Sequence, residues 1–155
     1  MPIGSVSWDD CQEFIQKLNK KTGKTFRLPT EAEWEFAARG GNKSKYTKFS
    51  GSSNWDEVAW CYENSDGKIH PVKTKKANEL GIYDMSGNVW EWCKDYWYQK
   101  YSSYNVVNPI GPGSGGNHVL RGGSYEYGAY HLSYRSYAKP DKSNIAFSLR
   151  LVLSE

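Results

Sequence analysis

The sequence lacks any apolar run long enough to cross a membrane as a helix, and residues 1–4 do not have the form of a secretory signal peptide. It has few cysteines: Cys11, Cys61 and Cys93 show neither the CxxC spacing of a zinc site nor the even number of a disulfide framework. No internal repeat and no linker divides the 155 residues. We therefore expect a single domain, residues 1–155, with no membrane insertion and at most one disulfide.

A strong excess of one charge is also missing. Lys and Arg number 20 against 17 Asp and Glu, which gives a formal net charge of +3. The lysines are spread along the chain and are densest in residues 17–24 and 68–76, a pattern typical of a solvated surface. Nucleic acid is therefore not an expected partner.

Aromatic residues are what the sequence has in abundance. They make up 15% of the chain, with 7 Trp and 12 Tyr against 2 Met. Much of the core must then consist of packed rings, whose N–H and O–H groups need hydrogen-bond partners. This composition predicts a polar, loop-rich interior.

Two helices are expected in the first third of the chain. Ser7 can cap an amphipathic helix that runs to Gly23, with apolar residues at helical spacing: Trp8, Cys11, Phe14, Ile15 and Leu18. Thr30 and Glu33 form a Thr-x-x-Glu capping box for a second helix, which Gly40 and Gly41 end. Its Trp34 and Ala37 are expected to face the core.

The rest of the chain predicts ordered loop and short strands. Residues 42–82 have little periodicity, but their isolated aromatics argue against disorder. Val119 and Leu120 indicate a strand that ends in a bend, and residues 147–153 alternate as in a half-buried strand. The expected fold class is α+β, loop-rich, with two helices and short antiparallel strands.

Three motifs occur in a fixed order: RLPTEAEWEFAARGG at residues 27–41, NELGIYDMSGNVWEW at 78–92 and LRGGSY at 120–125, preceded by VSWDDCQEF at 6–14. With them the chain resembles the formylglycine-generating enzyme family, the sulfatase-modifying-factor domain, which has a variant of the C-type lectin fold. The family's N-terminal part, with its Gly-rich strand, is missing ahead of Val6. The resemblance therefore implies one module of a larger bacterial protein.

The resemblance also implies an oxidase chemistry that this sequence does not support. The family's oxidases use a pair of cysteines shortly after the RGGS motif, together with copper, but no cysteine follows Cys93 here. Tyr, His or Leu cannot replace a thiolate, so we expect no copper site and no oxidation of a sulfatase cysteine. A branch of iron-dependent sulfoxide synthases uses histidines of a separate helical domain, which is also absent. His70, His118 and His131 lack metal-ligand spacing and are expected to be surface or hydrogen-bonded residues.

The resemblance further implies a calcium site in the second motif. Its ligands would be the side chains of Asp84 and Glu91 and the backbone carbonyls of Gly87 and Val89. Calcium prefers several hard oxygens and tolerates an irregular loop. The alternative is that Asp84 caps a turn and Glu91 makes an ordinary salt bridge.

Residues 87–97 contain three tryptophans and Cys93. Trp90 and Trp92 lie two residues apart, so in an extended segment they point to the same side, and core packing is the favoured interpretation. Trp97 can line a pocket or pack. Cys93 has no His or Asn in a recognisable relation to it, so a catalytic role is not expected.

Residues 125–137 hold five of the twelve tyrosines, interleaved with Ser, Gly, His131 and Arg135. Tyr and Ser on a loop supply binding surface at low entropic cost. In the family this position forms the oxidases' substrate groove, and variable proteins diversified by retroelements place their changing residues there. Tyr125 is expected in the core and Arg135 beside a buried carboxylate. A binding face is predicted at Tyr127, Tyr130, His131, Tyr134 and Tyr137, with Trp97 nearby.

These observations favour a non-catalytic recognition domain, a pseudoenzyme that binds a protein, peptide or glycan through the tyrosine-rich loop. An oxidase or an accessory domain of a larger enzyme is the alternative, and a structural or assembly module is also compatible with the sequence. We expect the domain to be part of an exported protein and to lie outside the cell or at its surface.

Overall fold

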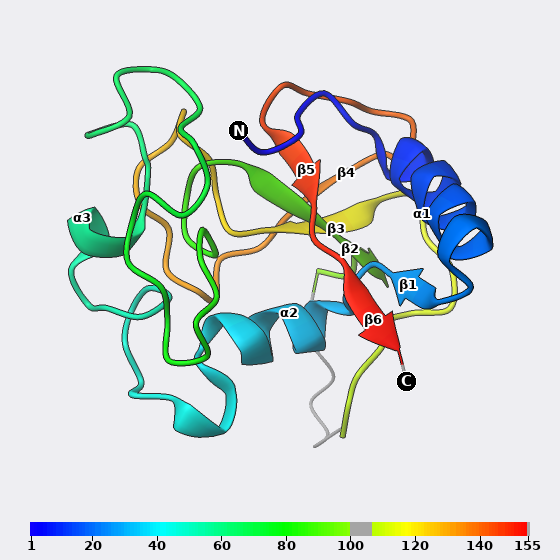
Figure 1. The fold of residues 1–155 in the computed structure, drawn as a ribbon, viewed down its shortest axis with the longest axis horizontal. Helices are drawn as coiled ribbons and strands as arrows, with labels where there is room; N and C mark the ends of the chain where they lie inside the picture. Colours follow the sequence, from blue (N-terminus) through cyan, green and yellow to red (C-terminus); the bar gives the residue numbers. More distant parts are fainter. Residues whose placement is uncertain (100–106, 155) are drawn as a thin grey trace.

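The computed structural model describes residues 1–99 and 107–154. In chain order the elements are α1 (Trp8–Thr22), β1 (Thr25–Arg27), α2 (Glu31–Ala38), the 3-10 turn η1 (Gly41–Lys43), α3 (Trp55–Val58), β2 (Trp90–Tyr96), β3 (His118–Arg121), β4 (Ser136–Ala138), β5 (Phe147–Leu149) and β6 (Val152–Ser154). The strands form a four-stranded sheet in the order β4-β3-β2-β5 and a two-stranded sheet of β1 and β6. In Figure 1, α1 lies at one side of the molecule and α2 runs along the lower side of the larger sheet. The α+β, loop-rich fold class is confirmed.

Both predicted helices form, with the predicted caps. Ser7 and Asp10 make a reciprocal capping box at the start of α1, and Gly23 ends it with a φ of 68°. Thr30 and Glu33 do the same at the start of α2. The face assignment of α1 was partly wrong, because Phe14 is 49% exposed whereas Cys11 and Ile15 are buried.

Strand β2 lies in the middle of the larger sheet and separates two hydrophobic clusters. Trp90 and Trp92 pack in the cluster that includes Cys11 and Ile15 of α1. Cys93, on the other side of the strand, packs in the cluster around Trp34 of α2. The prediction that both tryptophans are core is confirmed, and burying each such ring is worth about 5 kcal/mol of hydrophobic free energy.

The C-terminal strand prediction was wrong in three respects. Residues 147–153 form two strands in different sheets, β5 and β6, and β5 pairs with β2 in parallel rather than antiparallel. The alternation also fails, because Ser148 is 3% exposed while Leu153 is 49% exposed. The change of sheet after Leu149 brings Arg150 to Glu91, which is a tertiary contact that a period of two cannot encode.

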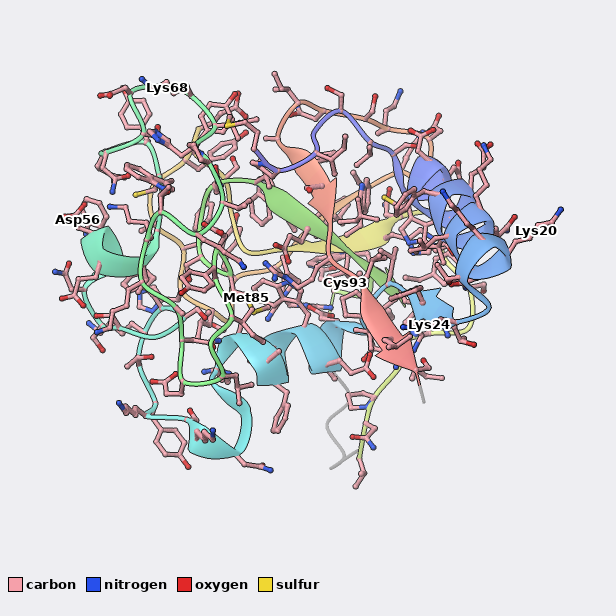
Figure 2. All side chains as sticks on the ribbon, in the orientation of Figure 1. Lys20, Lys24, Asp56, Lys68, Met85 and Cys93 are labelled. Carbon is pink, nitrogen blue, oxygen red and sulfur yellow. The ribbon has the colours of Figure 1, made fainter. Side chains whose placement is uncertain are left out.

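The long irregular region is ordered, as expected, and contains the short helix α3. Its chain passes close to the second motif at Gly87, where a Cβ atom would lie 2.2 Å from the carbonyl oxygen of Trp60. Gly87 also has a φ of 73°, so both the space and the backbone angle require glycine. Figure 2 shows Met85 and Cys93 inside the molecule, with Lys20, Lys24 and Lys68 at its periphery.

No helix in residues 1–99 and 107–154 is long and apolar enough to span a bilayer.

Candidate functional site

A buried arginine at the end of β3 holds the tyrosine loop, which we define as residues 127–137. The Arg121 side chain is fully buried; its Nη2 donates to the Leu132 carbonyl at 2.8 Å and its Nη1 to the Tyr134 carbonyl at 3.2 Å. The same guanidinium pairs with Glu31 and Glu35 of α2, at 3.3 and 2.5 Å. The loop backbone is therefore tied to α2 through one rigid cation.

Three of the predicted binding tyrosines form one surface. The rings of Tyr130 and Tyr134 stack with centroids 3.8 Å apart and planes at 6°, and Tyr127 lies 6.2 Å from Tyr130. Tyr127 and Tyr134 are 50% and 44% exposed, whereas Tyr130 is half-buried. Trp90 supports the stack from below, with its ring 5.8 Å from Tyr130. We call these three tyrosines the tyrosine face.

The other predicted binding residues lie away from the tyrosine stack, His131 and Tyr137 on the loop and Trp97 just after β2. The Tyr137 ring is 52% exposed and lies 4.7 Å from Trp97, which also carries the Arg135 guanidinium 4.4 Å from its centroid. His131 is exposed and contacts Phe49 at 5.5 Å. The structure therefore brings together Tyr127, Tyr130 and Tyr134, and places Trp97 with Tyr137 in a second aromatic pair.

Arg135 is structural, as predicted. Its Nε and Nη2 donate to the two carboxylate oxygens of Glu31 at 2.5 and 2.7 Å, and Nη1 donates to the Tyr98 carbonyl at 2.9 Å. Glu31 is 6% exposed, so this is the buried carboxylate that the sequence analysis expected.

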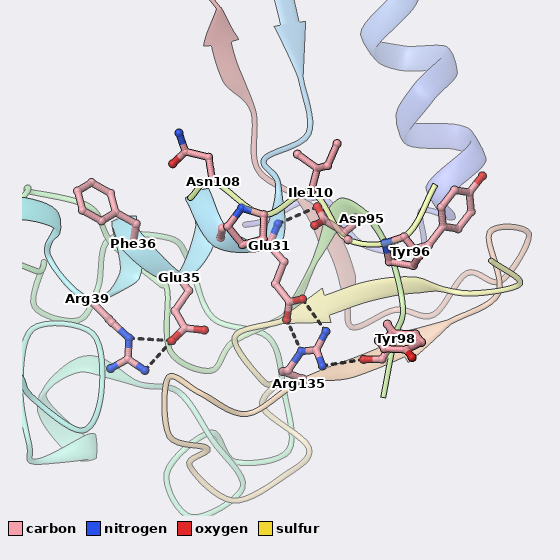
Figure 3. Close-up of a pocket in the computed structure, with 14 residues that line it drawn as sticks. Glu31, Glu35, Phe36, Arg39, Asp95, Tyr96, Tyr98, Asn108, Ile110 and Arg135 are labelled. Carbon is pink, nitrogen blue, oxygen red and sulfur yellow. Dashed lines mark hydrogen bonds and ion pairs between the residues drawn. The ribbon is translucent and has the colours of Figure 1, made fainter. Parts of the chain in front are cut away.

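A cavity of about 750 Å³ lies on the α2 side of these ion pairs (Figure 3). It is bordered by α2, the end of β2 and residues 108–112. Asp95 lines it and is 5% exposed; burial, together with the nearby charge of Glu31, raises the pKa of the Asp95 carboxyl. This cavity could not be predicted from the sequence, because Glu31 and Asp95 are far apart in the chain and only the packing of α2 against β2 brings them together. The acidic residues Glu31 and Glu35, four apart on the second predicted helix, were the available signal.

The thiols are poorly placed for chemistry. Cys11, Cys61 and Cys93 are all free and at most 1% exposed. Burial raises the pKa of Cys11 to about 12 and that of Cys61 to about 12, and it raises the pKa of Cys93 well above its ordinary value. Each thiol therefore stays protonated and shielded at neutral pH.

Two of the histidines stack on aromatic rings and lie within hydrogen-bond distance of backbone carbonyls. His118 is 2% exposed, stacks on Trp8 at 3.8 Å and lies 3.1 Å from the Lys94 carbonyl through Nδ1. His70 stacks on Trp60 at 3.7 Å. Burial lowers the pKa of His118.

Three of the four predicted calcium ligands, Asp84, Val89 and Glu91, line a second cavity of about 460 Å³ together with Arg150, whereas Gly87 does not line it. The Asp84 Oδ2 accepts from the Lys73 N–H at 2.8 Å, and burial, followed by the charge of Glu91, raises the pKa of Asp84. The donor atoms are hard oxygens of the kind that calcium binds.

Glu91 already has other partners. It accepts from Arg150 at 2.7 and 2.9 Å and from the Trp34 Nε1 at 2.7 Å. Across residues 1–99 and 107–154 no three His, Cys, Asp or Glu side chains gather as a metal site. Asp84, Glu91 and the carbonyls of Gly87 and Val89 could hold calcium only in competition with Arg150, so calcium stays a prediction.

Comparison with known proteins agrees with this fold. The model of the sulfatase-modifying factor enzyme 1-like domain matches residues 1–155. The formylglycine-generating enzyme of Streptomyces coelicolor is 36% identical over 161 aligned residues, covering 92% of this chain and 49% of that enzyme. The chaperone protein LppX of Paenibacillus barcinonensis is 50% identical over 88 residues, 46% of this chain and 31% of LppX.

Among solved structures, Treponema denticola variable protein 1 superposes with a TM-score of 0.89 at 30% identity, over 97% of this chain and 70% of that one. The chain spans about half the length of the Streptomyces enzyme. The same conclusion follows from the three sequence motifs, from the fold and from the family match over residues 1–155. The chain belongs to the formylglycine-generating enzyme family, the sulfatase-modifying factor enzyme 1-like domains.

Proposed function

We propose that this chain is a non-catalytic recognition domain that binds a protein, peptide or glycan through the tyrosine face. The observation that carries the proposal is the stacked, partly exposed pair of Tyr130 and Tyr134, with Tyr127 beside it. Large amphipathic rings with few rotatable bonds give contact area at low entropic cost.

The loop is rigid in the way that a binding surface needs. Arg121 holds two of its carbonyls, and the Leu132 N–H donates to the Lys48 carbonyl at 3.2 Å. At its other end the Tyr127 carbonyl accepts from the Tyr62 N–H at 2.9 Å. A backbone fixed before binding has less conformational entropy to lose on binding.

Catalysis by a cysteine pair is not supported in this chain. The tyrosine loop has no cysteine, and the three thiols elsewhere are buried with raised pKa values. The relatives named as a variable protein and a chaperone are similar to this chain and are not named as oxidases. Since both are longer than the match, we place this domain in a larger protein.

The test is a screen of the purified protein against a glycan array and a displayed peptide library. Ligands that bind the wild type should bind Tyr127→Ala and Tyr134→Ala at least about fivefold more weakly, since aromatic contacts at an interface are worth about 1 kcal/mol or more. Tyr46→Ala, at a ring that is 93% exposed, is the matched control and should bind normally. A ligand that binds all variants equally would place recognition elsewhere.

The oxidase alternative has its own assay. A sulfatase-motif peptide incubated with the protein and copper should yield no aldehyde. Aldehyde formation above a protein-free control would show that the chain is an enzyme.

A further inference from the structure

We propose that the cavity between α2 and residues 108–112 is a second binding site, for a small organic molecule that carries one ammonium or guanidinium group on an apolar or aromatic body. The site is separate from the tyrosine face, because none of Tyr127, Tyr130 and Tyr134 lines it. Its volume of about 750 Å³ suits a small ligand, since such pockets commonly measure about 300–1,000 Å³.

One wall of the cavity is apolar and uncovered. Phe36 of α2 is 56% exposed, Tyr98 is 60% exposed and Ile110 is 71% exposed. Pro109 and Pro112 continue this wall along the segment opposite the helix. Exposed apolar side chains gathered around a hollow are typical of a ligand site rather than of ordinary surface.

The floor of the cavity holds a carboxylate, Asp95, that has no cationic partner in residues 1–99 and 107–154. Glu31 pairs with Arg135 and Arg121, and Glu35 pairs with Arg121 and Arg39. By contrast, no Lys, Arg or His among the described residues forms an ion pair with Asp95. Its Oδ2 accepts the Glu31 N–H at 2.9 Å, which is a neutral donor.

A buried carboxylate without a countercharge is costly, and a cation supplied by a ligand would remove that cost. The nearby charge of Glu31 adds to the negative potential at this point. Asp95 and Gly111 line the cavity side by side, and Gly111 packs closely against the Asp95 side chain. A Cβ at Gly111 would come within 3.3 Å of the Asp95 Cβ and 3.4 Å of its Oδ1. The chemistry that fits is therefore a cationic group at Asp95 with its apolar body against Phe36 and Ile110, residues that Figure 3 shows around the same space.

The test compares three probes of one shape, phenethylamine, 2-phenylethanol and 3-phenylpropionate, in titrations followed by amide NMR. Phenethylamine should shift the signals of Glu31, Asp95 and Ile110. The neutral alcohol should bind about tenfold more weakly or worse, because it lacks the charge-assisted bond, and the acid should not bind. Equal binding of amine and alcohol, or no shift at the highest soluble amine concentration, would overturn the proposal.

Variants separate the site from general effects on folding. Asp95→Asn keeps an acceptor for the Glu31 N–H but removes the charge, and should weaken phenethylamine binding about tenfold. Phe36→Ala should also weaken it, whereas Phe14→Ala, at a similarly exposed ring on α1, should not. A native-like amide spectrum for each variant is required. Wild-type affinity in Asp95→Asn would refute the assignment. A lysine-containing hexapeptide that binds more than about tenfold tighter than phenethylamine would show a peptide site instead of a small-molecule site.

Discussion

At the scale of single residues, the fold depends on arginines that each join several partners, with Arg121 fully buried and Arg150 partly buried. Arg121 joins two carboxylates of α2 to two carbonyls of the tyrosine loop, and its guanidinium lies 5.1 Å from the Trp34 ring centroid. Arg150 joins Glu91 of β2 to the Tyr83 carbonyl. Each planar cation donates in several fixed directions at once, which an ammonium group cannot do.

We therefore expect Arg121→Lys to lower the free energy of unfolding by about 3 kcal/mol, because it leaves buried acceptors unpaired. The tyrosine loop should also lose its fixed geometry, which broadens the amide signals of Leu132 and Tyr134. Urea unfolding measures the first effect and NMR the second. Arg39→Lys is the control, since Arg39 is 43% exposed in its pair with Glu35 and should cost less than about 1 kcal/mol. Equal losses in the two variants would mean that Arg121 is not the anchor.

At the scale of elements, local chemistry predicted the helices better than the strands. The capping boxes at Ser7 and Thr30 depend on residues three apart, so they are visible in the sequence. The C-terminal strands depend on partners far away: β5 pairs with β2 and β6 with β1. Alternation of polar and apolar residues identifies the buried face of a strand only when the opposite face is exposed to solvent. In β5 the polar Ser148 is itself buried, because it pairs with Glu91 in the parallel strand β2.

The N-terminal cap of α2 should contribute to the stability of the cavity wall, because this short helix positions Glu31, Glu35 and Phe36 at the cavity. Thr30→Ala removes the oxygen that accepts the Glu33 N–H at 3.2 Å. We expect a loss of about 1 kcal/mol in unfolding free energy, measured by urea denaturation. Thr22→Ala, at the exposed end of α1, should cost clearly less. A negligible loss for Thr30→Ala would show that Glu33 and tertiary packing hold this terminus without the hydroxyl.

At the scale of the whole molecule, the family and fold could be predicted from three motifs, whereas the site could be predicted only in part. The tyrosine loop could be predicted because its tyrosines lie close together in the sequence. Its division into the tyrosine face and the Trp97–Tyr137 pair was not, because adjacent side chains on an irregular loop follow no period. The cavity beside Asp95 was missed for the same physical reason, since α2, β2 and residues 108–112 meet only in the folded chain.

Binding of calcium at Asp84 and Glu91 can be tested through the stability of the whole molecule. An ion bound only by the native state raises its stability, by about 2.7 kcal/mol at a hundred times the dissociation constant. Calcium chloride should therefore raise the midpoint of thermal unfolding relative to a chelator, and magnesium chloride should raise it less, because magnesium demands a stricter geometry. Asp84→Asn should lose most of the calcium-induced rise in the unfolding midpoint. Arg150→Met removes the cation that competes for Glu91, so this variant should be less stable without calcium but should show a larger rise with it. A midpoint that calcium leaves unchanged in both the wild type and Arg150→Met would refute the calcium site and leave Arg150 as the cation that neutralises Glu91.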